Sequence, residues 1–327
     1  TNGGVGLRPK RLRFGPAALV GGCWLAAAAL ASPLGQVDPG LHLLVKRAVR
    51  RTTEQSWAKP LQPEEVAVTV VDLADPAGPT HASHRGDAAI YPASVVKLFY
   101  LVAAHQALED GRLADTAELR RALRDMIVKS YNEATHYVVD LLTGTTSGPE
   151  LSAADLAVWQ DRRNAVNRYF EGLGYTNINV NKKPWCEGPY GRETQAIATF
   201  TPKRNLLTTD ATARLLVEIA TRRAVSARRS AEMMDLLRRG PSAPADPDAE
   251  SQAEFTGPAL PAGSRFWSKA GWTSEVRHDA VFVELPDGGR MVLVMFTVGH
   301  ANETGILHHI AREILSGRKE HPPSPGR

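Results

Sequence analysis

The chain has 327 residues, 43% of them hydrophobic and 23% charged, a balance that is typical of a folded protein with a large core and excludes disorder throughout. The formal net charge is +4, from 39 basic and 35 acidic side chains. Four of the basic residues lie in the first 13 positions and no acid precedes Asp38, so the chain without residues 1–31 has no net charge. We therefore expect no nucleic-acid partner.

The first 31 residues have the order of an export signal. Basic residues come first, then the apolar stretch Phe14–Ala31, which ends in a small-x-small sequence before Ser32. This order predicts a secretory signal peptide. The alternatives are an uncleaved membrane anchor, since 18 apolar residues approach the length of a span, and lipid attachment at Cys23, which the apolar residues after it disfavour. All three place the protein outside the cytoplasm, periplasmic or secreted, with membrane contact only through an uncleaved leader.

A helix and two strands are predicted next. Apolar residues at helical spacing predict a helix over Leu41–Arg51, and β-branched alternation predicts strands over Glu65–Asp72 and His81–Arg85. The pattern then becomes helical, apart from an irregular stretch over Asn177–Thr201. The helices predicted in this region are Ser94–Glu109, Ala117–Ser130, Ala134–Leu142, Ala153–Leu173, Thr208–Arg222 and Ala227–Arg238.

Strand patterns return after a loop rich in proline, alanine and aspartate, Pro241–Glu250. The last predicted elements are strands over Ser264–Ala270, Asp279–Leu285 and Arg290–Val298 and a helix over Thr304–Leu315. Strands at both ends with helices between them predict an α/β (α+β) fold, in which an antiparallel sheet built from the N- and C-terminal segments carries an inserted all-helical lobe. We expect one domain over residues 32–318, with a sheet lobe at about 38–90 and 258–316, a helical lobe at about 91–257, and a disordered tail at 319–327.

A serine and a lysine begin the first helix of the predicted helical lobe. Ser94 and Lys97 are three residues apart and so share one helix face. A lysine can take the proton of a serine hydroxyl when burial lowers the lysine pKa, and the free N–H groups of a helix start can stabilise an oxyanion. On its own the tetrapeptide equally fits a capping serine and a solvent-exposed lysine.

Two further motifs follow in order, Ser130-Tyr131-Asn132 after a predicted helix and Lys269-Ala270-Gly271 at the end of a predicted strand. Class A β-lactamases and penicillin-binding proteins carry S-x-x-K, S-D-N and K-T-G in this order. The sequence resembles this family from about Leu41 to Leu315. Residues 167–174 resemble the helix before the family's omega loop, and residues 183–189 resemble that loop.

The resemblance implies a serine hydrolase that opens β-lactam amides through an acyl-Ser94 intermediate. Lys97 would be the base or proton relay, Ser130 would pass a proton to the leaving nitrogen, and Glu187 would be the loop acid that activates the deacylating water, with Glu193 as a less favoured substitute. The substrate-binding residues implied are Asn132, Lys269, Ala270, Gly271, Trp272 and Arg277, among which the backbone N–H groups of Ser94 and Trp272 would form the oxyanion hole.

The motifs depart from the family pattern at three residues and in their spacing, since the 36 residues from Ser94 to Ser130 are fewer than is usual in β-lactamases and the stretch to Lys269 is longer. Tyr131 replaces the aspartate of S-D-N, Ala270 replaces the hydroxyl residue of K-T-G, and Glu187 lacks an asparagine four residues later. Arg277 is one candidate to replace the lost contact with the substrate carboxylate. Two alternatives therefore stay open: a D,D-peptidase-like or other amidase or esterase acting on cell-wall peptides, and a catalytically impaired penicillin-binding-type module.

Motifs for other chemistry are missing from the sequence. Cys186 is the only cysteine after the leader, which excludes an internal disulfide, and we expect it to be a small buried side chain. No metal, nucleotide or nucleophile-elbow motif is found. We expect a monomer without metal or cofactor that acts on a small β-lactam or a cell-wall peptide.

Overall fold

The computed structural model describes residues 34–74, 78–240 and 251–318. The predicted leader, the loop Pro241–Glu250 and the tail lie outside the described residues. All described residues belong to one compact unit. Within this part of the chain we find no helix with the length and hydropathy that a bilayer crossing requires.

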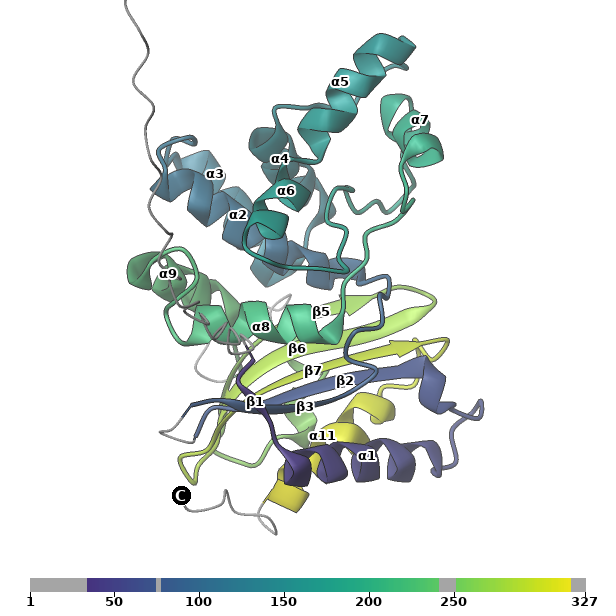
Figure 1. Ribbon diagram of the computed structural model, residues 1–327, viewed down its shortest axis with the longest axis vertical. Coiled ribbons are helices and arrows are strands. Elements are labelled where there is room, and N and C mark those ends of the chain that lie inside the picture. The colour runs from purple at the N-terminus through teal and green to yellow at the C-terminus, as the bar shows by residue number, and fades with distance from the viewer. Residues whose placement is uncertain (1–33, 75–77, 241–250, 319–327) are drawn as a thin grey trace, which may run out of the picture. The chain divides into compact units, whose positions relative to one another are not determined.

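The sheet has seven strands in the order β1-β3-β2-β7-β6-β5-β4 (Figure 1). Neighbouring strands are antiparallel except β1 and β3. β2 pairs with β7, so the N- and C-terminal segments meet in the middle of the sheet, which confirms the predicted architecture. The strands are β1 Gln36–Val37, β2 Val66–Asp72, β3 Thr80–His84, β4 Arg238–Arg239, β5 Arg265–Trp272, β6 Val276–Glu284 and β7 Arg290–Val298.

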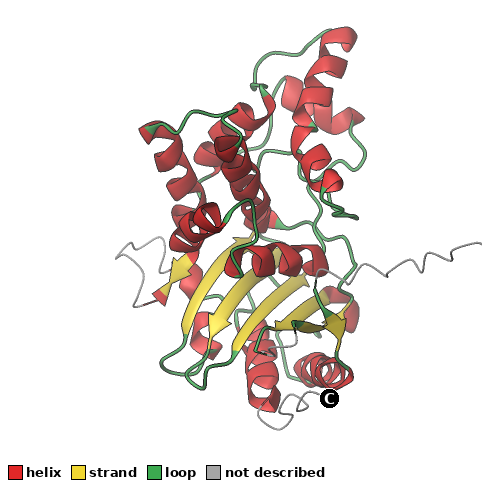
Figure 2. Cartoon of the chain, turned by 60° about the vertical axis from the view of Figure 1, so that its left-hand side comes forward, coloured by secondary structure: helices red, strands yellow, loops and turns green. Residues whose placement is uncertain are grey.

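Helices cover both faces of the sheet (Figure 2). The terminal helices α1, Pro39–Thr53, and α11, Gly305–Arg318, pack on one face. The opposite face meets the helical lobe, with α8, Thr209–Ala220, directly against the strands. Alternate residues of β2 therefore enter two different cores: Val66, Val68 and Val70 pack on the terminal-helix side, and Ala67 and Val71 pack under the helical lobe. Burial on both faces explains why β2 is an almost continuous apolar run.

The helical lobe is built around α2, which is buried along most of its circumference. A short 3₁₀ turn, Ala93–Val96, leads into it and carries Ser94. The lobe helices are α2 Lys97–Glu109, α3 Ala117–Arg124, α4 Asn132–Thr143, α5 Ala153–Arg163, α6 Ala165–Gly172, α7 Arg192–Thr199 and α9 Ala227–Leu237.

Three of the helical predictions differ from the structure. The helix predicted over Ala153–Leu173 is divided at Asn164, whose Oδ1 accepts hydrogen bonds from two other asparagine side chains instead of lying on a regular helix face. The helix predicted over Ala117–Ser130 changes to π-helical geometry over Asp125–Lys129. α7 lies within the stretch predicted to be irregular.

Candidate active site

The turn that carries Ser94 is held against the edge of β5. A Cβ atom added to Gly271 would lie 2.7 Å from the Pro92 carbonyl oxygen and 3.0 Å from the Ser94 backbone nitrogen. This approach is closer than any side chain permits, so the glycine is what allows the strand to contact the turn. The structure therefore places two of the predicted motifs, Ser94 with Lys97 and Lys269 with Gly271, next to each other.

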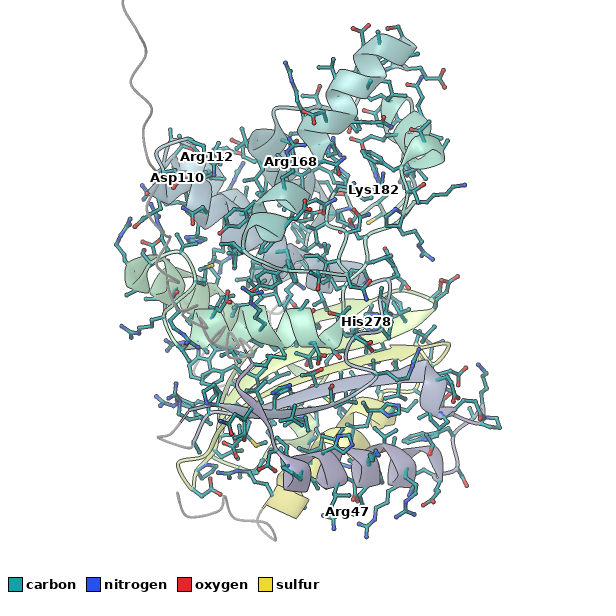
Figure 3. The ribbon with its side chains drawn as sticks, viewed as in Figure 1. Arg47, Asp110, Arg112, Arg168, Lys182 and His278 are labelled. Atoms are coloured by element: carbon teal, nitrogen blue, oxygen red, sulfur yellow. The ribbon has the colours of Figure 1, made fainter. Side chains whose placement is uncertain are left out.

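His278 of β6 fixes the same turn from below, and Figure 3 shows it where the sheet meets the helical lobe. Its Nε2 lies 2.9 Å from the Tyr91 carbonyl oxygen, and its Nδ1 accepts a hydrogen bond from the Thr297 backbone N–H. These partners require a proton on Nε2 and none on Nδ1. Burial lowers the His278 pKa to about 4, so the ring is neutral and serves as a fixed tether.

The Ser130 hydroxyl lies between two lysines. Lys97 Nζ donates to Ser130 Oγ at 3.2 Å, and Lys269 Nζ donates to the same oxygen at 2.9 Å. Ser130 ends the π-helical turn in the left-handed region, with φ 59°. Ser130 therefore leaves the helical conformation at the position where its hydroxyl meets the two lysines.

Lys97 also binds the start of α4. Its Nζ donates to Asn132 Oδ1 at 2.9 Å and to the Ser130 carbonyl oxygen. The backbone N–H of Lys97 donates to the Ser94 carbonyl, which places the lysine one turn after the serine. The predicted residues Ser94, Lys97, Ser130, Asn132 and Lys269 thus belong to one connected site.

Burial changes the protonation of both lysines. It lowers the Lys97 pKa to about 7, against the smaller opposing effects of Cys186 and Glu133. It also holds the Lys269 pKa well below its usual range, and the nearby cations Lys97 and Arg239 lower it further. A lysine that loses its proton near neutral pH can act as a general base toward a hydroxyl.

Several residues behind Lys269 had not been predicted. Gln252 Oε1 accepts from Lys269 Nζ at 2.8 Å, and Asp279 stands opposite Ala270 in the β5–β6 register. Burial raises the Asp279 pKa to about 7, although Thr256 Oγ1 donates to the carboxyl. The sequence did carry one signal for Asp279, which is a charged residue at the start of an otherwise apolar predicted strand. Gln252 offered none, since its role depends on tertiary contacts alone.

The loop 183–189 brings a thiol, not a carboxylate, to the site. Asn132 Nδ2 donates to Cys186 Sγ at 3.1 Å. Cys186 is exposed, so the expectation of a buried side chain was wrong. Glu187, the acid expected here, is also exposed and has no hydrogen bond or ion pair in the described part of the chain. The structure therefore does not bring Glu187 into the network of Lys97.

Glu193 is bound elsewhere, in a buried ion-pair cluster at the end of the same loop. Its carboxylate accepts from Arg163 at 2.8 and 3.0 Å, and Lys183 Nζ lies 3.5 Å away. Arg163 lowers the Glu193 pKa against the larger opposing effect of burial. Because this carboxylate is already paired, it is a structural anchor of the loop and not a free acid for water activation.

Trp272 and Arg277 face each other across the β5–β6 pair. Trp272 is 52% exposed and donates its Nε1–H to the Ala301 carbonyl. Arg277 stacks on Phe255, with its guanidinium carbon 3.9 Å from the ring centroid. Arg277 is therefore near the strand end that carries Gly271, while its guanidinium is held by an aromatic ring.

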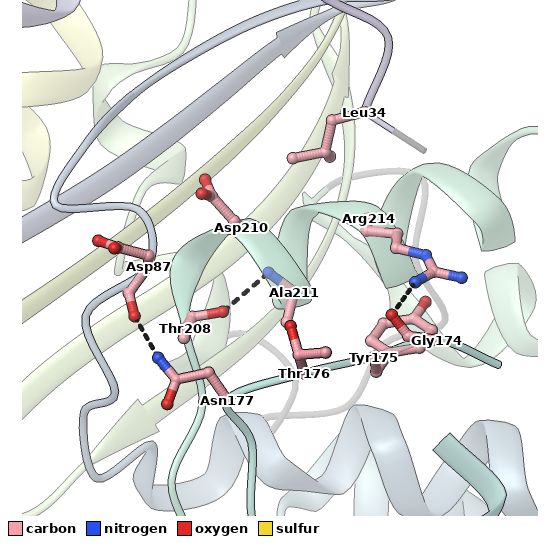
Figure 4. Close-up of a pocket in the computed structure, with 10 residues that line it drawn as sticks. All are labelled: Leu34, Asp87, Gly174, Tyr175, Thr176, Asn177, Thr208, Asp210, Ala211 and Arg214. Atoms are coloured by element: carbon pink, nitrogen blue, oxygen red, sulfur yellow. Dashed lines mark hydrogen bonds between the residues drawn. The ribbon is translucent and has the colours of Figure 1, made fainter. Parts of the chain in front are cut away.

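A separate pocket of about 230 Å³ lies between residues 174–177 and the start of α8 (Figure 4). None of the predicted site residues lines it. Several of its polar groups are engaged in holding the chain: Asn177 Nδ2 donates to the Asp87 carbonyl, and Arg214 donates to the Gly174 carbonyl. These contacts fix the segment before α8.

Comparison with known proteins identifies the family of this chain and solved structures of similar fold. A sequence model described as "Beta-lactamase enzyme family" matches residues 58–316, and a search of the curated proteins found no match. The fold is similar to a β-lactamase from Sphaerobacter thermophilus (22% identity, TM-score 0.59, 85% of this chain and 98% of that one). It is also similar to a class A β-lactamase from Bacteroides cellulosilyticus (15% identity, TM-score 0.61, 86% of this chain and 99% of that one). A third similar structure is a PBP-A variant in its acyl-enzyme complex with penicillin G (18% identity, TM-score 0.60, 87% of this chain and 98% of that one).

Proposed function

Since this chain belongs to the β-lactamase enzyme family, we propose that it is a serine hydrolase that opens β-lactam amides through an acyl-Ser94 intermediate. The observation that carries the proposal is the Ser130 hydroxyl held between Lys97 and Lys269, beside the turn of Ser94. Two buried amines around one hydroxyl are costly to maintain for stability alone. They suit a reaction that moves a proton between a nucleophile and a leaving nitrogen.

In the proposed acylation, neutral Lys97 takes the Ser94 proton while Ser94 Oγ attacks the lactam carbonyl. The backbone N–H groups at Ser94 and Trp272 would stabilise the oxyanion. Ser130 then donates its proton to the leaving nitrogen as the C–N bond breaks, and Lys97 returns a proton to Ser130. Lys269 would attract the substrate carboxylate, which suits an anionic lactam or a peptide with a free C-terminus.

The test is mass spectrometry of the protein after mixing with a penicillin, together with nitrocefin turnover. We expect a covalent adduct on Ser94 that Ser94→Ala abolishes. Absence of any adduct and of any turnover would reject the proposal. Turnover that depends on Ser94 would also exclude the catalytically impaired module.

Cys186 at the loop position beside Asn132 favours a second candidate, a D,D-peptidase-like or other amidase or esterase acting on cell-wall peptides. Such an enzyme forms the acyl-enzyme and deacylates slowly toward water. The PBP-A variant, similar in fold, is described as an acyl-enzyme with penicillin G. Glu187→Gln discriminates the two: a longer acyl-enzyme lifetime would identify Glu187 as the deacylation acid, and an unchanged one would favour the second candidate.

Export fits both candidates, because β-lactams and cell-wall peptides are met outside the cytoplasm. We propose that residues 1–31 direct this export. N-terminal sequencing of the protein recovered from the producing cells would distinguish cleavage near Ala31 from retention of the leader.

A further inference from the structure

The amide of Asn132 is fixed by contacts on both of its ends. Lys97 Nζ donates to Oδ1, and Nδ2 donates to Cys186 Sγ. Protonated Lys97 has no acceptor, so in that state the amide cannot turn over without placing two donors against each other. Nδ2 carries two hydrogens, and one of them remains for the substrate when the other binds sulfur. Cys186 thus orients the group that is expected to bind the acyl side chain.

The loop around Cys186 is attached to α4 just before the cysteine. Trp185 packs on His136 in a tilted arrangement with ring centroids 4.2 Å apart, and His136 Nε2 bonds the Pro184 carbonyl. Within the loop, Tyr190 packs edge-on against Trp185 at 6.0 Å. The loop therefore holds Cys186 in a defined place although its side chain is exposed.

Cys186 also lies near Lys97, because the two side chains contact opposite ends of one amide. Lys97 Nζ binds Asn132 Oδ1, and Cys186 Sγ binds Asn132 Nδ2. Glu187, one residue later, makes no contact with this amide.

We propose that Cys186 is a positioning residue that sets the lifetime of the acyl-enzyme, by orienting Asn132 and by placing a thiol where the loop faces Lys97. This inference rests on the proposed acyl-Ser94 intermediate. Sulfur is a weak hydrogen-bond acceptor, so it holds and orients a water molecule poorly. The ester carbonyl of acyl-Ser94 is then attacked by water slowly, while acylation itself, which needs Asn132 in place, stays efficient.

The experiment measures acylation rate and acyl-enzyme lifetime separately, with a fluorescent penicillin and intact-protein mass spectrometry, for three substitutions of Cys186. Cys186→Ser keeps an acceptor for Asn132, and we expect an acylation rate within about three-fold of the original protein. Cys186→Ala removes the acceptor and should slow acylation about five-fold, the effect of one neutral hydrogen bond. Cys186→Asp places a carboxylate beside Lys97 and should shorten the lifetime at least about ten-fold, at the low end of general-base effects.

Ala198→Asp is the matched control, because Ala198 is exposed on α7, has no polar side-chain atom and gains the same charge. Its acyl-enzyme lifetime should equal that of the original protein. Equal lifetimes for Cys186→Asp and Ala198→Asp, with an adduct on Ser94 in both, would overturn the inference and leave the proposed function intact. A serine variant as slow in acylation as the alanine variant would overturn the orienting role.

A measurement that needs no acylation tests the contact itself. Iodoacetamide should alkylate Cys186 at a different rate in Asn132→Ala, because the sulfur loses its hydrogen-bond donor, and at an unchanged rate in Ala198→Asp. An unchanged rate in Asn132→Ala would overturn the contact. No Ser94 adduct in any variant would instead reject the proposed function, and the lifetime role with it, even if the alkylation rates differ.

Discussion

Lys97 and Lys269 donate to the same hydroxyl, that of Ser130, from 3.2 and 2.9 Å. They come from the helical lobe and from the sheet, so the hydroxyl joins the two halves of the site. Two ammonium groups that contact the same oxygen repel each other, and burial adds to the free-energy cost of keeping both charged. The site is therefore poised to release a proton near neutral pH.

Acylation should depend on pH through Lys97. Its pKa of about 7 is depressed by burial, and only the neutral amine can accept the Ser94 proton. We expect the acylation rate to rise as pH increases from about 5.5 and to level off above about 8. Stopped-flow acylation with a fluorescent penicillin would measure the profile. A rate that falls over this interval would show that protonated Lys97 is the active form.

Removing the charge of Lys269 should affect anionic substrates selectively. In Lys269→Met, a penicillin with its free carboxylate should acylate Ser94 about 100-fold more slowly, since a charge-assisted contact and a neighbour of Ser130 are both lost. A neutral thioester, which has no carboxylate, should lose clearly less. Comparison of the two second-order rate constants checks this, and equal losses would contradict a carboxylate-binding role.

Gly271→Ala should move the Ser94 turn. The new Cβ would lie 2.7 Å from the Pro92 carbonyl oxygen, a backbone atom that cannot move alone. We expect a loss of roughly 1–3 kcal/mol in the free energy of unfolding and a much slower acylation. Gly172→Ala is the matched control, because an added Cβ there meets nothing within 4 Å. Urea denaturation compares the two, and equal stability would show that the close approach is not maintained in solution.

Arg163 and Glu193 should stabilise the loop only when both are present, because each neutralises the buried charge of the other. Arg163→Met leaves the buried Glu193 carboxylate with Lys183 at 3.5 Å as its remaining cation, and we expect a loss of about 3–5 kcal/mol in the free energy of unfolding. The double variant Arg163→Met with Glu193→Gln should recover a large part of that loss. Thermal or urea unfolding of the three proteins gives the coupling. A double variant no more stable than the single one would contradict it.

The motif residues could be predicted because they depend on local order. Ser94 and Lys97 sit one helical turn apart, and their partners lie at the start of α4 and the end of β5, as the spacing of helices and strands indicated. The strand patterns likewise predicted β2, β3, β5, β6 and β7, but not the two-residue strands β1 and β4, and Arg238 of β4 was predicted to be helical. What failed depends on contacts between distant segments: no periodicity selects Gln252 as a partner of Lys269.

The loop 183–189 is a second region where contacts between distant segments could not be predicted from the sequence. It has no regular repeat, so the sequence does not indicate which of two adjacent exposed side chains contacts the site. Cys186 does so through its bond with Asn132, and Trp185 before it packs on His136 of α4. Glu187, the acid that the motif suggested, makes no such contact.

The pairing of β2 with β7 affects when the site can form during synthesis of the chain. The strand that follows α1 is completed only by residues near the C-terminus, and the turn of Ser94 is held by Gly271 and His278, which are also synthesised late. During synthesis the nucleophile is therefore present long before the residues that position it. A nascent or truncated chain that ends before β5 would carry Ser94 and Lys97 without Lys269, Gly271 and His278, so the site can form only once β5 and β6 have been incorporated.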